Sequence, residues 1–236
     1  MMVSASIVGS QTSVSLLRLQ GSDEPVLVMD AATGQAEHLI AAASASRFEP
    51  ASAVGSGYPG LLGPAPHAYV DAMVRFVLPL LQQHWHTGPI RPKRARGNFS
   101  LVATPPEALS AEQRMPHVDA ADPLQFAAVH YLCGAQHGGT GFFRHRPTGF
   151  ETLDPARVEV FNKAMDDKTT LSYGYPAGDS ADFALIGACE AHMDRLVIYR
   201  SSLFHSGLIR ALPEHAEDPR RGRLTGNLFL QCEVAR

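Results

Sequence analysis

The stretch Arg223-Leu-Thr-Gly-Asn-Leu-Phe-Leu230 alternates two kinds of side chain with a period of two residues. Successive side chains of a β-strand point to opposite faces of the sheet. One face of the predicted strand is purely aliphatic and consists of Leu224, Leu228 and Leu230. The other face is mostly polar and consists of Arg223, Thr225, Asn227 and Phe229. We expect the leucine face to pack on other secondary structure and the polar face to look into the interior of a β domain.

Further strand patterns precede this one and alternate with turn signals from Asn98 to the C-terminus. The predicted strands are Phe99–Ala103, Phe126–Leu132, Thr140–Arg144, Phe183–Cys189, Arg195–Tyr199 and Arg223–Cys232. A helix interrupts them, because Asp154 suits an N-cap and Pro155 suits the first helical position. The pattern predicts a predominantly antiparallel β unit over residues 98–236.

Residues 1–97 contain the helical part of the chain. Short strands are expected at Val14–Leu19 and Val26–Met29, and a helix is expected from Asp30 or Thr33 to about Ser46. Apolar residues at helical spacing predict a second helix from about Pro66 to Trp85. The glycines and prolines of residues 55–64 predict a loop, and the basic residues 91–96 a solvated connection. The whole chain is predicted to be one α+β, mainly β domain with supporting N-terminal helices.

Length and composition place the chain among ordinary globular proteins. It has 236 residues, of which 45% are hydrophobic and 18% charged, and its formal net charge is −3. This charge gives no reason to expect nucleic acid or an anionic membrane as a partner. The three widely spaced cysteines encode neither a zinc ribbon nor a redox dithiol. Because neither a secretory signal nor a membrane-spanning stretch is recognisable, we expect a cytoplasmic protein.

The segment Pro116-His-Val-Asp119 is the strongest candidate for chemistry. His117 and Asp119 would point to the same side of an extended segment. A remote histidine, His205, lies in a loop-like segment that follows the predicted strand Arg195–Tyr199. Two histidines and one carboxylate form the facial triad that non-haem Fe(II) oxygenases use, with the opposite face of the metal open. We therefore predict that His117, Asp119 and His205 are metal ligands and catalytic residues.

The polar face of the C-terminal strand suggests a second ligand. An arginine that looks into the interior is costly unless an anion pairs with it. A bound dicarboxylate could form a bidentate contact with Arg223, and the Thr225 hydroxyl could add a hydrogen bond.

The order of these motifs resembles the 2-oxoglutarate/Fe(II)-dependent oxygenases, from about residue 25 to the C-terminus. It consists of His-x-Asp, a strand with Tyr131, Gly138-Gly-Thr-Gly-Phe142, a remote His205 and then Arg-x-Thr. The chain is most similar to a largely uncharacterised bacterial branch of this superfamily. The shared segments are Tyr58-Pro-Gly-Leu61, Gln113-Arg-x-Pro-His-x-Asp119, Phe142-Phe-Arg-His-Arg-x-x-Gly-Phe-Glu151 and Asn227-x-Phe229.

The resemblance implies a double-stranded β-helix (a jelly-roll related to cupins) over residues 98–236. It implies Fe(II) on the triad and 2-oxoglutarate as cosubstrate, with Arg223, Thr225 and Tyr131 as its binding residues. Oxygen and a small molecule or amino-acid-like group would be the other reactants. An intact Asp119 favours hydroxylation or a related oxidation over halogenation, because halogenating relatives lack this carboxylate. The spacing from His205 to Arg223 is longer than usual in the superfamily. Arg221 is a rival carboxylate binder, and we prefer Arg223 because the Arg-x-Thr pairing starts there.

Two alternatives remain open at the level of sequence. The first is a cupin-like metal-binding protein that does not use 2-oxoglutarate. The second is an α+β scaffold in which the His-x-Asp pair and His205 are brought together by coincidence. The substrate and the oligomeric state are not encoded in any recognisable motif. One further histidine, His130, lies within a predicted strand and is expected to be a hydrogen-bonded core residue.

Overall fold

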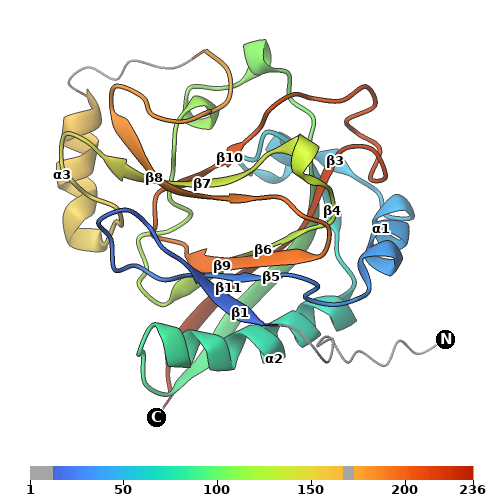
Figure 1. The fold of residues 1–236 in the computed structure, drawn as a ribbon, viewed down its shortest axis with the longest axis horizontal. Coiled ribbons are helices and arrows are strands. Elements are labelled where there is room, and N and C mark those ends of the chain that lie inside the picture. Colours follow the sequence, from blue (N-terminus) through green and yellow to red (C-terminus); the bar gives the residue numbers. More distant parts are fainter. Residues whose placement is uncertain (1–12, 167–172, 236) are drawn as a thin grey trace.

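The computed structural model describes residues 13–166 and 173–235, and it shows two antiparallel sheets flanked by helices (Figure 1). The larger sheet has the strand order β1-β2-β9-β6-β11-β5-β4-β3. Its strands are β1 (Val14–Leu17), β2 (Val26–Met29), β9 (Arg195–Arg200), β6 (Gln125–Tyr131), β11 (Arg223–Val234), β5 (Ile90–Val102), β4 (Gly60–Pro64) and β3 (Glu49–Pro50). The smaller sheet, in the order β10-β7-β8, contains β10 (His205–Leu208), β7 (Gly139–His145) and β8 (Phe183–Glu190).

Strand β11 lies at the centre of the larger sheet and pairs with β5 on one side and β6 on the other. Thr225 is opposite Ser100 on β5 and opposite Tyr131 on β6. The pairing with β5 continues to Val234, with one irregularity between Gln231 and Cys232. Since both edges of Thr225–Gln231 are bonded, the direction of every side chain on this stretch is fixed by its neighbours.

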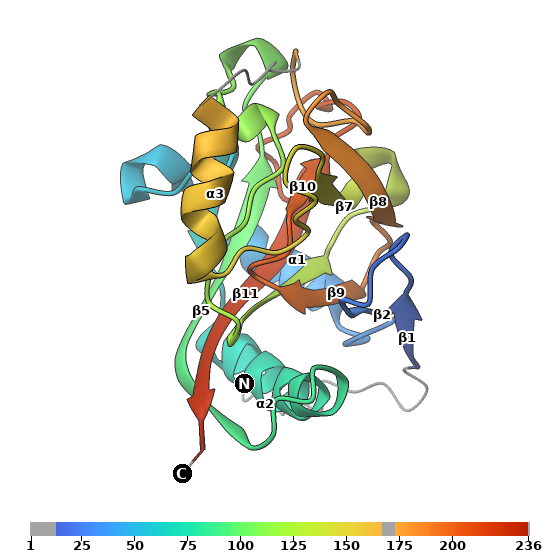
Figure 2. The same cartoon turned by 90° about the vertical axis from the view of Figure 1, so that its left-hand side faces the viewer.

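Two helices cover one face of the larger sheet (Figure 2). They are α1 (Ala36–Ser44) and α2 (His67–His84), and α2 packs against β5 and β11. The buried residues of α2 recur at helical spacing and are Tyr69, Ala72, Met73, Val77 and Leu81. The leucine face of β11 joins this cluster, as the alternation of the sequence predicts. Among the described helices, none is long and apolar enough to cross a bilayer.

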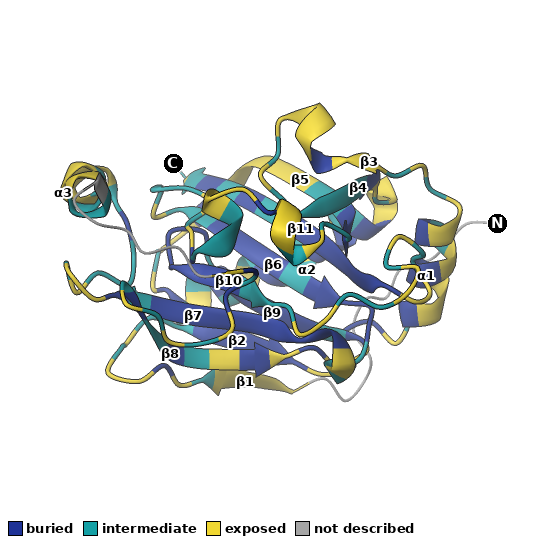
Figure 3. Cartoon of the chain, turned by 90° about the horizontal axis from the view of Figure 1, so that it is seen from above, coloured by how far each residue is buried: buried dark blue, intermediate teal, exposed yellow. Residues whose placement is uncertain are grey.

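The opposite face of the larger sheet packs on the smaller sheet (Figure 3). Phe142 and Ile186 of the smaller sheet meet Val197, Tyr199 and Tyr131 of the larger one. The third helix, α3 (Pro155–Asp166), lies at the side and places Phe161 against Phe204. The N-cap predicted for α3 is confirmed, because Asp154 Oδ1 accepts hydrogen bonds from the amides of Ala156 and Arg157, at 2.9 and 3.0 Å.

The expectation of an α+β, mainly β chain with N-terminal helices on a sheet is confirmed, with two local corrections. Residues 91–96 are not a connection but the first half of β5, although their side chains are exposed. Residues 60–64 are not a loop but strand β4. Gly60 allows β4 to approach β5 closely, because a Cβ at this position would lie 2.0 Å from the Leu101 carbonyl oxygen.

A buried polar network connects α2, β6, β9 and the start of α1. The His130 side chain is fully buried, as expected for a core histidine. Its Nε2 lies 2.8 Å from Asp194 Oδ1, and its Nδ1 lies 3.0 Å from the Tyr69 hydroxyl. Asp194 also accepts hydrogen bonds from the amides of Thr33 and Gly34. Since a carboxylate only accepts, Nε2 donates to Asp194 and Nδ1 accepts from Tyr69.

Replacing Asp194 by Asn tests the contribution of this network to stability. The Asn amide fits the left-handed backbone at position 194 but cannot accept every hydrogen bond that the carboxylate accepts. We expect the free energy of unfolding in urea to fall by about 2–3 kcal/mol. The control is Glu233→Gln, which removes an exposed ion pair with Arg91 and should cost less than about 1 kcal/mol. If both variants lost the same free energy of unfolding, the buried network would contribute no more to stability than an exposed ion pair, contrary to this prediction.

Candidate functional site

Backbone pairing brings His117 and His205 together from distant parts of the chain. The His117 amide donates to the His205 carbonyl at 3.0 Å, and the His205 amide donates to the His117 carbonyl at 2.9 Å. The Asp119 amide donates to the Ser201 carbonyl at 2.8 Å. The segment around His117 is therefore not a full strand, as the sequence suggested, but an isolated bridge to the first residue of β10.

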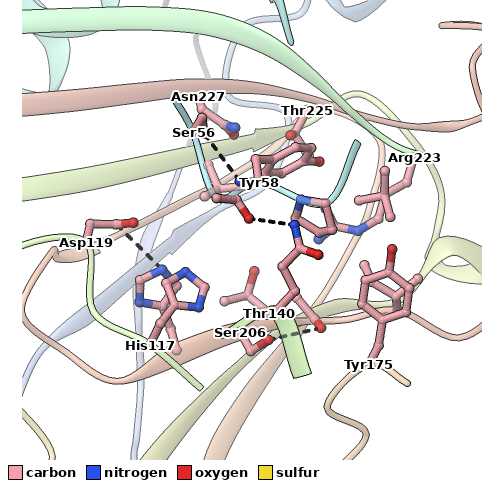
Figure 4. A pocket seen from close by; sticks show the side chains of 18 of the residues that line it. Ser56, Tyr58, His117, Asp119, Thr140, Tyr175, Ser206, Arg223, Thr225 and Asn227 are labelled. Atoms are coloured by element: carbon pink, nitrogen blue, oxygen red, sulfur yellow. Dashed lines mark hydrogen bonds and ion pairs between the residues drawn. The ribbon is translucent and has the colours of Figure 1, made fainter. Parts of the chain in front are cut away.

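The three predicted ligands converge at this bridge (Figure 4). Ligand atoms of His117, Asp119 and His205 all lie within 4.8 Å of one another. His205 Nε2 is 3.6 Å from Asp119 Oδ2, and the two imidazole rings are 4.6 Å apart between centroids. Two neutral nitrogens and one carboxylate oxygen at this spacing suit a divalent transition metal.

Neighbouring groups fix the orientation of the His205 ring. Its Nδ1 lies 2.8 Å from the Leu203 carbonyl oxygen, which can only accept, so Nδ1 carries the proton. Nε2 then keeps its lone pair and points toward Asp119. A hydrogen bond from the ring nitrogen that does not bind the metal to a backbone carbonyl is the usual way in which proteins orient a metal-binding histidine. The ring of Tyr199 packs beside it, with centroids 4.7 Å apart.

The protein surroundings keep both imidazoles neutral at physiological pH. Burial lowers the pKa of His205 to about 4, although the hydrogen bond that its Nδ1 donates to the Leu203 carbonyl acts in the opposite direction. Burial and the neighbouring His205 lower the pKa of His117 to about 4, although His117 also opens toward the pocket, where water weakens the effect. Burial raises the pKa of Asp119, while His117 and Arg96 lower it. Neutral histidines are the form that binds a metal.

The triad faces a cavity of about 340 Å³ between the two sheets. The polar face of β11 forms one wall, with Arg223, Thr225, Asn227 and Phe229 all lining it. The predicted direction of this face is therefore confirmed. The exposed Arg221 lies before β11 and does not line the cavity, so of the two rival arginines it is Arg223 that faces the pocket.

Arg223 is a buried cation for which the described residues offer no carboxylate. The residue is 6% exposed, and its Nη2 donates a hydrogen bond to the Gly139 carbonyl oxygen at 2.9 Å. Nε is buried without any hydrogen-bond partner in the described part of the chain. An unpaired buried charge is expensive, so this geometry favours an anionic ligand in the cavity.

Tyr58 and Tyr175 line the pocket near Arg223, whereas the predicted Tyr131 is not part of the lining. The Tyr131 hydroxyl is 2.5 Å from Thr140 Oγ1, and its ring lies behind Arg223, 5.5 Å from the guanidinium carbon. Tyr58 lines the cavity, and its buried hydroxyl lies close to Thr225 and Arg223 but forms no hydrogen bond of ordinary geometry with the described residues. Burial raises the pKa of Tyr58 to about 12, although nearby Arg223 and Thr225 lower it, so the hydroxyl remains a donor.

Sequence reasoning missed the position of Tyr58, although Tyr58-Pro-Gly-Leu61 is one of the segments that carry the resemblance. Tyr58 precedes β4, and β4 pairs with β5 so that Gly60 is opposite Val102. Val102 is in turn opposite Arg223 on β11. The contact therefore depends on two successive strand registers, which no local pattern reveals.

A family model matches residues 10–230 of this sequence. The chain belongs to DUF6445, a family of unknown function. No curated protein shows significant sequence similarity to this DUF6445 member.

Solved structures that resemble this DUF6445 chain distantly include the following two proteins. HygX from Streptomyces hygroscopicus, with nickel, 2-oxoglutarate and hygromycin B bound, is 12% identical and has a TM-score of 0.45 over 89% of this chain and 83% of its own. An N-substituted L-amino acid dioxygenase from Burkholderia ambifaria AMMD is 10% identical, with a TM-score of 0.41 over 93% and 94% of the two chains. Likenesses this distant do not bear on the chemistry of the site.

The lowered pKa of His205 predicts how the stability of the metal-free protein depends on pH. Between the unfolded value of 6.5 and the folded value of about 4, the unfolded chain binds more protons, so stability falls as the pH falls through this window. We expect the urea midpoint to drop between pH 7 and pH 4.5, with His205 accounting for about 2–3 kcal/mol. In the His205→Gln variant, stability to urea should depend less steeply on pH. An unchanged slope would show that His205 is not a cause of the pH dependence.

Proposed function

We propose that this DUF6445 protein is an Fe(II)- and 2-oxoglutarate-dependent oxygenase that acts on a small molecule or an amino-acid-like group. The observation that carries the proposal is a single cavity that holds both a two-histidine, one-carboxylate triad and a buried arginine without a carboxylate partner. A metal-binding scaffold without a cosubstrate would have no need for the buried cation. A scaffold in which the two histidines and the carboxylate met by coincidence would need neither a shared cavity nor a buried cation beside them.

The metal would be held by His117, Asp119 and His205. The donor set fits Fe(II), because it is facial, neutral at both nitrogens and open toward the cavity. Bound there with 2-oxoglutarate, Fe(II) supplies the oxidation of a C–H bond by O₂, with CO₂ and succinate as coproducts. The intact carboxylate of Asp119 favours hydroxylation or a related oxidation over halogenation.

The cosubstrate would lie along β11 with its distal carboxylate at Arg223. The free Nε and the planar guanidinium allow a bidentate contact. The hydroxyls of Thr225 and Tyr58 would add two hydrogen bonds at the same end of the cavity. Tyr131 would act indirectly, since its ring supports the guanidinium from behind. Every polar group in this corner would then have a partner.

The remaining walls would exclude water from the reacting groups. Val129, Ile209 and Phe229 are apolar residues of the lining, and Tyr199 shields the buried side of His205. Removal of water strengthens the electrostatic contacts of a bound dicarboxylate. The protein would thus position and shield the metal and the cosubstrate.

We also propose a specific type of β fold for this chain. The two facing antiparallel sheets, with the cavity between them, support a distorted double-stranded β-helix of the jelly-roll type over residues 98–236. Core residues from both 1–97 and 98–236 share one cluster, which supports a single domain. The cytoplasmic location expected from the sequence stays a prediction.

The metal assignment is tested by anaerobic addition of Fe(II) and 2-oxoglutarate. We expect the weak visible charge-transfer absorption of a metal-bound 2-oxo acid in the unmodified protein. His205→Ala should weaken Fe(II) binding by about 100-fold or more, because it removes one of three protein ligands. His67→Ala, which changes an exposed histidine at the start of α2, is the matched control and should bind Fe(II) normally. A folded protein that gives no absorption would rule out the proposed oxygenase.

Arg223→Gln separates the oxygenase from a metal-binding protein that does not use 2-oxoglutarate. The variant loses a charge-assisted bidentate contact, so its affinity for 2-oxoglutarate should fall by roughly 100-fold, or about 3 kcal/mol, while Fe(II) still binds. The control is Arg221→Gln, which removes the exposed arginine outside the cavity and should leave the affinity unchanged. If the unmodified protein binds Fe(II) but has no measurable affinity for 2-oxoglutarate, the metal-binding alternative is correct.

A further inference from the structure

The cavity extends along β11 beyond the reach of a cosubstrate bound at Arg223. Residues of a strand rise by about 3.4 Å each, so the Cα atoms of Asn227 and Phe229 lie about 14 and 20 Å from that of Arg223. Both residues line the same cavity. The four C–C bonds of 2-oxoglutarate, each about 1.5 Å, span no more than about 6 Å. The Asn227–Phe229 end is therefore left for another molecule.

Asn227 presents an unsatisfied polar group at this end. The residue is 8% exposed, and its Nδ2 donates to Ser100 Oγ at 2.7 Å. Its Oδ1 is buried without a hydrogen-bond partner in the described part of the chain. If the amide is turned over, Oδ1 meets Ser100 and Nδ2 is left free, so one end of the group lacks a protein partner in either orientation. A buried polar atom without a hydrogen-bond partner is unfavourable, and a ligand that bonds to Asn227 would remove this cost.

Arg96 lies next to this end, on the pocket face of the sheet. Phe229 is directly opposite Arg96 in the β11–β5 register, and Asn227 is opposite Asn98. Residues 96, 98 and 100 share one face of β5, and Ser100 of that face bonds to Asn227 in the cavity. Directly opposed residues have Cβ atoms about 4.5–5.5 Å apart, so Arg96 borders the aromatic wall. Its charge also acts on Asp119 of the triad.

The charges around Arg96 leave it available to a ligand. Arg96 is exposed, and none of the described carboxylates lies within 4 Å of its guanidinium. The carboxylate of Asp122 accepts a hydrogen bond from the side-chain amide of Gln231 at 3.0 Å and one from the backbone amide of Leu124 at 2.9 Å. Glu112, a carboxylate in the lining, accepts a hydrogen bond from Ser110 at 2.8 Å. Asp119 would be committed to the metal.

We propose that Arg96, Phe229 and Asn227 form the primary-substrate subsite, and that it takes a small organic molecule with an oxyanion, a carboxylate or a phosphate, bound at Arg96. The proposal rests on the proposed oxygenase function. The oxyanion pairs with Arg96 at the mouth of the cavity, the apolar part of the substrate lies on Phe229, and a polar group meets Asn227. The carbon to be oxidised then faces the triad, between this subsite and the cosubstrate.

The test uses three fluorinated probes and the full-length protein saturated with Fe(II) and 2-oxoglutarate under anaerobic conditions. The probes are 4-fluorobenzoate, 4-fluorophenyl phosphate and the neutral 4-fluorobenzamide, and binding is followed by fluorine NMR. Saturating 2-oxoglutarate keeps the probes away from Arg223. We expect at least one anionic probe to bind at least about tenfold more tightly than the amide, the effect of one modest charge contact. The preferred anion distinguishes carboxylate from phosphate recognition.

Two variants locate the contact. Arg96→Gln should abolish the preference for the anion, while thermal unfolding and the chelate absorption show that the protein is folded and loaded. Arg94→Gln, which changes an exposed arginine two residues away on the same strand, should keep the preference. Equal binding of all three probes, an unchanged preference in Arg96→Gln, or an equal loss in Arg94→Gln would overturn the proposal. Absence of the chelate absorption from the unmodified protein would instead count against the oxygenase function itself.

Discussion

The site depends on one pair of backbone hydrogen bonds, which His117 and His205 exchange. The first residue sits in an otherwise irregular segment, and the second begins β10. An exchanged pair of this kind fixes both the distance and the relative rotation of two residues. The further bond from the Asp119 amide to the Ser201 carbonyl holds the carboxylate at the same place. The backbone thus brings the three side chains together before any metal does.

A second constraint concerns buried charge. Three buried or half-buried ionic groups outside the cavity have partners of opposite charge or a histidine: Asp194 with His130, Arg200 with Glu24, and Arg144 with Glu151. Arg223 is different, because its described partners are a carbonyl and an aromatic ring. Folding that leaves a buried guanidinium without a counter-ion must be compensated elsewhere, and such groups concentrate at functional sites. The same cavity also contains unpartnered polar atoms of Tyr58 and Asn227.

Strand β11 links stability and function. Its leucines belong to the core cluster beneath α1 and α2, whereas its polar residues form a wall of the cavity. Because β5 and β6 bond both of its edges, the strand cannot shift without exposing leucines and burying polar residues. The order of groups along the wall, from a cation through a hydroxyl and an amide to an aromatic ring, is therefore rigid. This order suits two ligands placed end to end.

The sequence by itself determined the features that depend on local periodicity and residue chemistry. Alternation predicted both faces of β11, helical spacing predicted α2, and Asp154 with Pro155 predicted the start of α3. The residue types also singled out His117, Asp119 and His205, and the structure places potential ligand atoms of these residues within 4.8 Å of one another. The predictions of the strand faces and of the helices are confirmed, because each depends on neighbouring residues alone. The role of the three side chains as metal ligands stays a proposal.

Only the tertiary structure decided which groups meet across strands. It placed Tyr58 beside Arg223 and Tyr131 behind it, and it turned residues 60–64 and 91–96 into strands. Glycine, proline and clustered charge weaken the local strand signal there, and hydrogen bonds from β5 and β11 override it. Register between distant strands is a collective property of the sheet, so the sequence identified the chemical groups and the fold decided their neighbours.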